Sequence, residues 1–184
     1  MPSSASTRDI GAIIDFWMEA GPEAWFRKDE TFDQVFRQRH EHLHFMAARR
    51  ELDDWNSSSH GVLALMILLD QFPRNAYRHT AHMYATDSLA LAFARAAVDA
   101  GLDKQLDSPL QLFYYLPFCH SENLADQERS VQLYASLPAS YMPHAIEHLD
   151  VIERFGRFPH RNHILGRQST PEELEFLKNG GFSG

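Results

Sequence analysis

Three apolar segments of the sequence each end in polar side chains of the kinds that bind or process ligands. Asp70 follows the apolar run 62–69, His120 and Glu122 close a second apolar segment, and Arg157 follows a third. Histidine titrates near neutral pH and a neighbouring carboxylate can orient its ring, so His120 and Glu122 could act as a catalytic acid/base pair. The alternative is a buried histidine that caps its own helix.

Asp70 requires a partner because it ends a wholly apolar helix. A buried carboxylate is costly unless a cation or several hydrogen-bond donors accompany it. Arg74, or an arginine from elsewhere in the chain, is the natural candidate.

One end of the molecule could collect these side chains. In an up-and-down arrangement the three apolar helices point the same way, which brings their polar ends together. If residues 77–86 form a full extra helix, the first of the three apolar helices points the opposite way from the other two, and its polar end lies apart from theirs. The side chains expected to meet are those of Asp70, Arg74, His120, Glu122, Arg157 and Arg161.

A basic segment favours a small anionic molecule as the ligand. Residues 154–167 contain four arginines and no acidic residue, in a chain with a net charge of −8. Guanidinium groups bind carboxylates and phosphates through two parallel hydrogen bonds. Near helix C-termini, however, arginine and asparagine also commonly bind the last carbonyl groups, which is a purely structural alternative. The candidate ligand-binding residues are Asp70, Arg74, Asn75, His148, Arg157, Arg161, Asn162 and Arg167.

The remaining histidines and the single cysteine are weaker candidates for ligand binding, metal binding or catalysis. His148 lies within a predicted helix, where a packed core or rim histidine is the alternative to a ligand-binding one. His40 and His44 share a helix face without a third ligand nearby, so we expect no metal ion. Cys119 precedes His120, but a free cysteine in an apolar helix is typical of core packing rather than of a nucleophile. No pattern predicts a cofactor.

Composition sets the broad class. The chain has 184 residues, of which 44% are hydrophobic and 23% charged, and these values are typical of one globular domain, here residues 1–184. Its acidic balance argues against binding to nucleic acid or to an anionic membrane. The longest apolar run has eight residues, far fewer than the roughly 20 that span a bilayer. The first thirty residues carry no export signal, so we expect a cytoplasmic location.

Hydrophobic periodicity predicts about eight helices and no strands, and hence an all-α fold. Alternating amphipathic and fully apolar helices with short connections indicate stacked antiparallel hairpins, arranged as a bundle or a short superhelix. Pro73 is expected to stop the third helix, Ser108-Pro109 to open the fifth, and a capping box at Thr170 to open the last. Because they are almost wholly apolar, the third helix should be central and the fifth internal. The predicted helices lie at about 7–19, 31–50, 60–70, 87–100, 109–118, 124–136, 143–155 and 171–179.

Four ordered motifs cover nearly the whole chain. They read LMILLDQFPRN at 65–75, LPF followed by HSENL at 116–124, FGRFPHRN at 155–162, and LGR followed by TPEE at 165–173. With these motifs the chain resembles the bacterial family catalogued as domain of unknown function 924. The resemblance implies a helical fold similar to tetratricopeptide-repeat proteins, without a known activity or catalytic residues to carry over. Cys119 is not part of the family's pattern.

Two kinds of function therefore remain. The first is a pocket that binds, and could process, a small polar anionic ligand through arginine, histidine and carboxylate side chains. The second is a scaffold that holds a protein or peptide partner, as stacked helical hairpins commonly do, with the polar motifs purely structural. A deep cavity lined by the candidate residues favours the first, and an exposed groove with apolar anchors favours the second.

Overall fold

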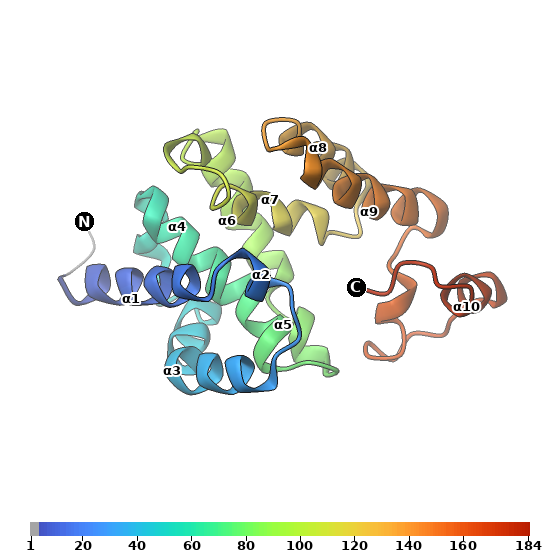
Figure 1. Ribbon diagram of the computed structural model, residues 1–184, viewed down its shortest axis with the longest axis horizontal. Coiled ribbons are helices and arrows are strands. Elements are labelled where there is room, and N and C mark those ends of the chain that lie inside the picture. Colours follow the sequence, from blue (N-terminus) through green and yellow to red (C-terminus); the bar gives the residue numbers. More distant parts are fainter. Residues whose placement is uncertain (1–3) are drawn as a thin grey trace.

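The computed structural model describes residues 4–184, and every regular element in that range is helical (Figure 1). The predicted all-α class is confirmed. A π-helical segment, η2, covers Ile67–Gln71. Short 3₁₀ turns lie between the α-helices, and these are η1 (Asp53–Ser57), η3 (Ala81–Tyr84), η4 (Asp103–Gln105), η5 (Ala139–Tyr141) and η6 (Pro159–Arg161). The α-helices are α1 (Ser4–Ala20), α2 (Pro22–Trp25), α3 (Glu30–Ala48), α4 (Ser59–Met66), α5 (Phe72–Ala76), α6 (Asp87–Asp99), α7 (Leu112–Cys119), α8 (Leu124–Tyr134), α9 (Met142–Phe155) and α10 (Pro171–Lys178).

Among the residues whose side chains the structure describes, the hydrophobic core has two parts. The larger part surrounds α4 and η2, whose side chains from Gly61 to Gln71 are all buried, as the apolar run predicts. The smaller part lies near the C-terminal end of the chain, where Val151, Ile152 and Phe158 pack together. Helices α6 to α9 pack each on the next, and α10 lies beyond α9 at the side opposite the start of α1 (Figure 1).

The prediction that Pro73 stops the third helix is wrong. Helical backbone continues from α4 through η2 into α5, with Pro73 in the first turn of α5. Proline lacks an N–H and crowds the carbonyl group four residues earlier, so carbonyl groups in this region need other donors. Two distant side chains supply them: Thr86 Oγ1 donates to the carbonyl of Leu69, and His44 Nδ1 donates to that of Leu68 at 2.8 Å. These two hydrogen bonds stabilise the widened helical turn that contains Asp70.

The fifth predicted helix also begins later than expected. The Ser108–Pro109 peptide bond is cis, and residues 107–111 form hydrogen-bonded turns, so α7 starts only at Leu112. The prediction that this helix is internal is confirmed, because all its side chains are buried. The capping box predicted at Thr170 is present and opens α10. Within residues 4–184, no helix is both long and apolar enough to cross a membrane.

Candidate functional site

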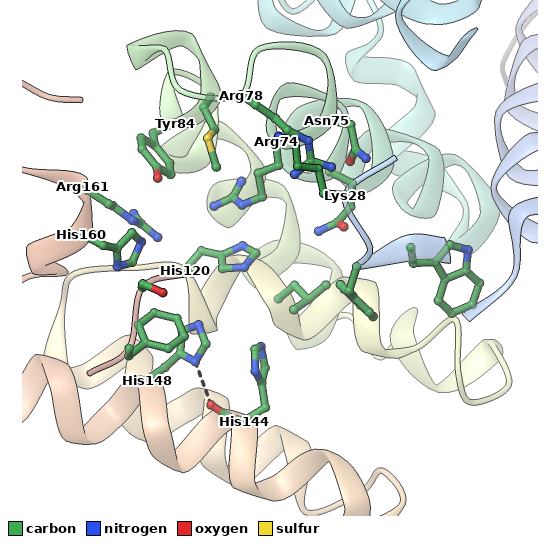
Figure 2. Close-up of a pocket in the computed structure, with 18 of the residues that line it drawn as sticks. Lys28, Arg74, Asn75, Arg78, Tyr84, His120, His144, His148, His160 and Arg161 are labelled. Carbon is green, nitrogen blue, oxygen red and sulfur yellow. Dashed lines mark hydrogen bonds between the residues drawn. The ribbon is translucent and has the colours of Figure 1, made fainter. Parts of the chain in front are cut away.

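A cavity of about 690 Å³ opens between α5, α7 and α9, with residues from η3, η6 and the C-terminal segment completing its wall (Figure 2). Apolar side chains such as Trp25, Leu112 and Leu116 form one part of the lining. No aspartate or glutamate side chain is among the described residues that line it, although the chain as a whole is acidic. The basic and histidine side chains of the lining are Lys28, Arg74, Arg78, His79, His120, His144, His148, His160 and Arg161.

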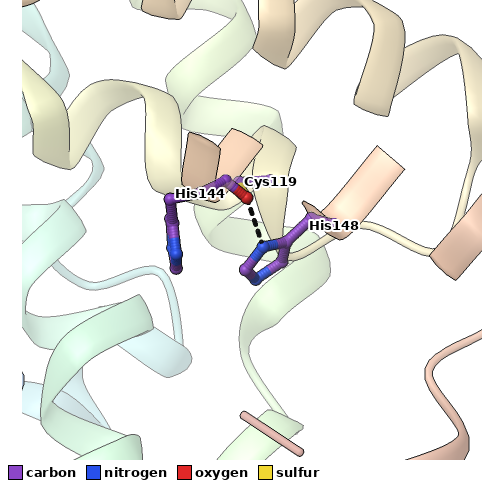
Figure 3. A group of neighbouring side chains, drawn as sticks. All are labelled: Cys119, His144 and His148. Atoms are coloured by element: carbon purple, nitrogen blue, oxygen red, sulfur yellow. Dashed lines mark hydrogen bonds between the residues drawn. The ribbon is translucent and has the colours of Figure 1, made fainter. Parts of the chain in front are cut away.

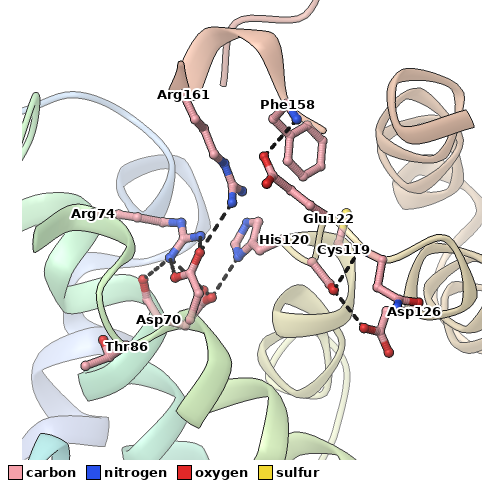
Figure 4. Close-up of polar contacts among 12 residues, drawn as sticks. Asp70, Arg74, Thr86, Cys119, His120, Glu122, Asp126, Phe158 and Arg161 are labelled. Atoms are coloured by element: carbon pink, nitrogen blue, oxygen red, sulfur yellow. Dashed lines mark hydrogen bonds and ion pairs between the residues drawn. The ribbon is translucent and has the colours of Figure 1, made fainter. Parts of the chain in front are cut away.

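Asp70 lies directly behind this lining and holds His120. Its side chain is 1% exposed, and its Oδ1 accepts a hydrogen bond from His120 Nδ1 at 2.7 Å (Figure 4). Gln71 Nε2 donates to the other carboxylate oxygen at 2.7 Å. Burial alone would raise the pKa of Asp70, but the positive charge of Arg74 and the contact with His120 outweigh it and hold this pKa well below its usual range. Asp70 is therefore a buried carboxylate anion.

Arg74 is the expected partner of Asp70, and it also binds a second carboxylate. Arg74 Nη1 lies 3.3 Å from Asp70 Oδ1 and donates to the main-chain oxygen of Asp70 at 2.7 Å. The guanidinium group then contacts both carboxylate oxygens of Asp87, at 2.8 and 3.0 Å. Asp87, at the start of α6, gave no sequence signal that could have linked it to Arg74. Most hydrogen-bonding capacity of Arg74 is thus used within the protein.

Arg161 is held very differently. Its side chain is 8% exposed, and its guanidinium carbon lies over the rings of Tyr84 and Phe158, at 4.6 and 4.4 Å from their centroids. Its Nε is buried and has no hydrogen-bond partner among residues 4–184, and its nearest carboxylate oxygen, in Asp87, is 3.5 Å away (Figure 4). Burial and the neighbouring charge of Arg74 lower the pKa of Arg161. The side chain nevertheless stays cationic, because arginine deprotonates only at extremely high pH.

Three further histidines complete the cavity wall beside α9 and η6. His148 donates from Nδ1 to the main-chain oxygen of His144, 2.8 Å away. Loss of hydration, greatest for the buried His148, lowers the pKa of His148 to about 2 and the pKa values of His144 and His160 to about 4, so all three rings are neutral at pH 7. Sequence reasoning found His148 but missed His144 and His160. The spacing of His144 and His148, four residues apart on one helix, is the signal that could have linked them.

Besides Asp70, which lies behind the lining, four of the predicted site residues do not line this cavity. Glu122 binds Arg167 at 2.7 and 2.9 Å and accepts a hydrogen bond from the main-chain nitrogen of Phe158, so the predicted His120–Glu122 pair is wrong. The carboxylate that orients His120 belongs to Asp70. Glu122 instead lines a smaller hollow of about 340 Å³ on the other side of His120 and Arg161.

The other three form a structural cluster near α10. Arg157 binds Glu173 at 2.6 and 2.9 Å and the main-chain oxygen of Gln168. Asn162 accepts a hydrogen bond from Arg167 and donates to Glu173 at 3.2 Å. The chain reverses at Gly156, which adopts a left-handed conformation. The short turn η6 then directs His160 and Arg161 to the cavity, whereas Asn162 lies outside it.

The remaining predicted residues lie where expected. Asp70, Arg74, His120 and Arg161 converge at one end of the cavity, so the predicted meeting of helix ends holds for these four (Figure 4). Asn75 also lines the cavity and donates to Asp33 Oδ1 at 2.7 Å. Sequence reasoning missed Arg78, which binds the same Asp33, and Lys28, which comes from the loop after α2.

The chain is similar to a known protein family and to a solved structure. The family described as a bacterial protein of unknown function, DUF924, matches residues 13–181. A solved structure, described as a protein of unknown function ATU0120 from Agrobacterium tumefaciens, is 52% identical with a TM-score of 0.93, and the match covers 95% of this chain and 99% of that chain. No curated protein matches the chain. The helical fold is therefore shared with the Agrobacterium protein, and neither match names an activity.

Proposed function

The chain belongs to the bacterial protein family of unknown function DUF924, and we propose that it binds a small ligand with an anionic group in the cavity between α5, α7 and α9. The observation that carries this proposal is the state of Arg161. A buried cation normally has hydrogen-bonded anionic partners, because removing its hydration is costly. Arg161 has aromatic rings on its faces and a carboxylate only at 3.5 Å, so its donors remain available to a phosphate or carboxylate group.

The surroundings of Arg161 favour an anion over a cation. No acidic side chain lines the cavity among the described residues, whereas Lys28, Arg74 and Arg78 do. Behind the lining, Arg74 lies between the carboxylates of Asp70 and Asp87 and offsets one of their two charges. An arriving anion would therefore meet positive charge in a site that excludes much of the water, where electrostatic attraction is stronger than at a surface.

The remainder of the cavity indicates a ligand larger than an inorganic ion. A volume of about 690 Å³ lies in the range of ordinary small-molecule sites, which is roughly 300–1,000 Å³. Trp25, Leu112 and Leu116 offer an apolar surface along the same wall as the polar groups. The ligand that fits best is an organic phosphate or carboxylate whose apolar body rests on these side chains.

His120 adds an orienting group to this site. Its Nδ1 donates to Asp70, and its other ring nitrogen makes no hydrogen bond within the part of the chain that is described. A neutral imidazole held in this way presents Nε2 as an acceptor, suited to a hydroxyl group of the ligand. The site would thus recognise an anionic group at Arg161 and a hydroxyl group at His120.

Thermal unfolding with phosphate or a dicarboxylate tests the proposal. A ligand that binds only the folded state adds RT ln(1 + [L]/Kd), about 2.7 kcal/mol at 100 times Kd, so Tm should rise and then saturate. Sodium chloride at equal ionic strength should not reproduce the rise. Arg161→Lys keeps the positive charge but lacks the planar guanidinium group with its paired N–H donors, and it should abolish most of the rise in Tm.

Arg157→Lys is the matched control, because Arg157 lies outside the cavity in an ion pair with Glu173. This variant should keep the full response to phosphate. An equal response in the Arg161 variant, or no saturable response in the wild type, would contradict the proposal. The peptide-scaffold alternative would then become the better account of the fold.

A further inference from the structure

Cys119, at the end of α7, lies beside His144 and His148 of α9 (Figure 3). The Sγ atom of the cysteine and one ring nitrogen of each histidine all lie within 4.8 Å of one another. From this geometry we infer that the three side chains form a binding site for a zinc-type metal ion at the wall of the cavity. The inference does not depend on the proposed anion binding, and it goes against the sequence expectation of no metal.

The donor set selects the kind of metal. One sulfur and two imidazole nitrogens suit Zn²⁺ or Co²⁺, whereas Mg²⁺ and Ca²⁺ require oxygen ligands. With Zn–S of about 2.3 Å and Zn–N of about 2.0 Å, tetrahedral ligand atoms lie roughly 3.3–3.6 Å apart. Ligand atoms that lie up to 4.8 Å apart must therefore move closer together by as much as roughly 1–1.5 Å. His144 can make this movement, because this side chain is exposed and donates no hydrogen bond among the described residues.

His148 is already oriented as a ligand would be. Its Nδ1 donates to the main-chain oxygen of His144 at 2.8 Å, which fixes the ring and leaves the lone pair of the neutral imidazole on Nε2. Metal-bound histidines commonly make such a hydrogen bond through the nitrogen that does not coordinate. The pair His144 and His148 also has the four-residue spacing that presents two rings on one helix face.

The surroundings of the sulfur support a bound thiolate. The hydroxyl groups of Ser130 and Tyr134 neighbour Cys119, yet both are buried and have no oxygen or nitrogen partner in the described part of the chain. A neutral thiol is a weak acceptor, whereas a thiolate accepts hydrogen bonds strongly. When the metal binds, the S–H bond breaks, a metal–sulfur bond forms and the proton leaves to solvent. The two hydroxyl groups can then donate to the resulting sulfur anion.

The position of the site leaves room for a fourth ligand. His144 and His148 both line the large cavity, whereas Cys119 lies behind them in the core. Three protein ligands with an open position are the arrangement of catalytic rather than structural zinc sites. The fourth ligand would be a water molecule or an anionic group that enters from the cavity, and the exposed His144 gives the metal a path of entry.

Titration of the tag-free full-length protein with Co²⁺ tests this inference. We expect one equivalent to bind, with the visible absorption of a tetrahedral cobalt site and a near-ultraviolet band from thiolate-to-cobalt charge transfer. Cys119→Ser should remove the charge-transfer band. His144→Gln changes an exposed side chain and should preserve the fold, and it should weaken cobalt binding at least about tenfold.

His163→Gln is the matched control, because His163 is also exposed and lies outside the cavity. It should leave cobalt affinity unchanged. Circular dichroism of each variant establishes that it is folded. The absence of a thiolate band in folded wild-type protein, or equal affinity in the His144 and His163 variants, would overturn the inference. Because the readout is the metal spectrum, neither result depends on whether phosphate binds.

Discussion

Asp70 and His120 are separated by 50 residues in the sequence, yet the Oδ1 of one and the Nδ1 of the other lie 2.7 Å apart in the interior. This hydrogen bond joins the π-helical segment η2 to the end of α7. Widened helical turns of this kind are rare and frequently occur at functional sites. The pair fixes one wall of the cavity, so its removal should affect both stability and ligand response.

Asp70→Ala should lower the free energy of unfolding by about 3–5 kcal/mol, because it leaves the buried Arg74 with one carboxylate fewer and His120 without its acceptor. Urea denaturation at pH 7 measures the loss. Asp150→Ala, on the exposed face of α9, is the control and should cost less than about 0.5 kcal/mol. Similar losses for both variants would mean that the Asp70 network contributes little.

Arg157→Lys should destabilise the protein by about 1–2 kcal/mol, because lysine cannot reproduce the two hydrogen bonds to Glu173 and the contact with Gln168. Thermal unfolding measures the shift. The same variant should respond to phosphate as the wild type does. A weakened phosphate response would show that Arg157 contributes to anion binding, as the basic segment of the sequence predicts.

Stability should also depend on pH through His40, whose ring is buried between Phe16 and Phe36 and makes no hydrogen bond to any residue that the structure describes. Burial, with smaller effects of His42 and Arg39, lowers the pKa of His40 to about 4 in the folded state, whereas about 6.5 is usual in an unfolded chain. The unfolded state therefore binds a proton first as the pH falls from 6.5 to 4. Folding stability should decrease across this window by up to about 3 kcal/mol through this residue.

His40→Leu should remove that part of the pH dependence, measured as the free energy of unfolding at pH 7 and pH 4.5. His42→Leu, on the exposed face of the same helix, is the matched control and should retain the wild-type slope. If both variants lose stability with falling pH exactly as the wild type does, His40 is not the group that titrates.

The fold was largely predictable because hydrophobic periodicity and caps report on local structure. The apolar run 62–69 correctly indicated a central helix, and Thr170 correctly indicated the start of α10. The prediction of a helix stop at Pro73 was wrong because the effect of this proline depends on distant groups. The hydroxyl group of Thr86 and the ring of His44 donate to main-chain oxygens near the proline that would otherwise lack a donor. No local pattern contains that information.

The candidate site was predictable in part for the same reason. Helix ends brought Asp70, Arg74 and His120 together as expected, since each follows an apolar helix. The sequence could not separate Arg161 from Arg157, because only the turn at η6 sends one side chain to the cavity and the other to Glu173. Partners such as Asp87 meet the site through tertiary packing alone.

The most direct test of the proposed function is a crystal structure of the protein soaked in selenate, a phosphate-like anion whose anomalous scattering marks its position. The account predicts a peak in the cavity within hydrogen-bonding distance of the Arg161 guanidinium group, and no such peak in crystals of Arg161→Lys. A cavity without anomalous density, or selenate bound only at surface arginines such as Arg154, would contradict it.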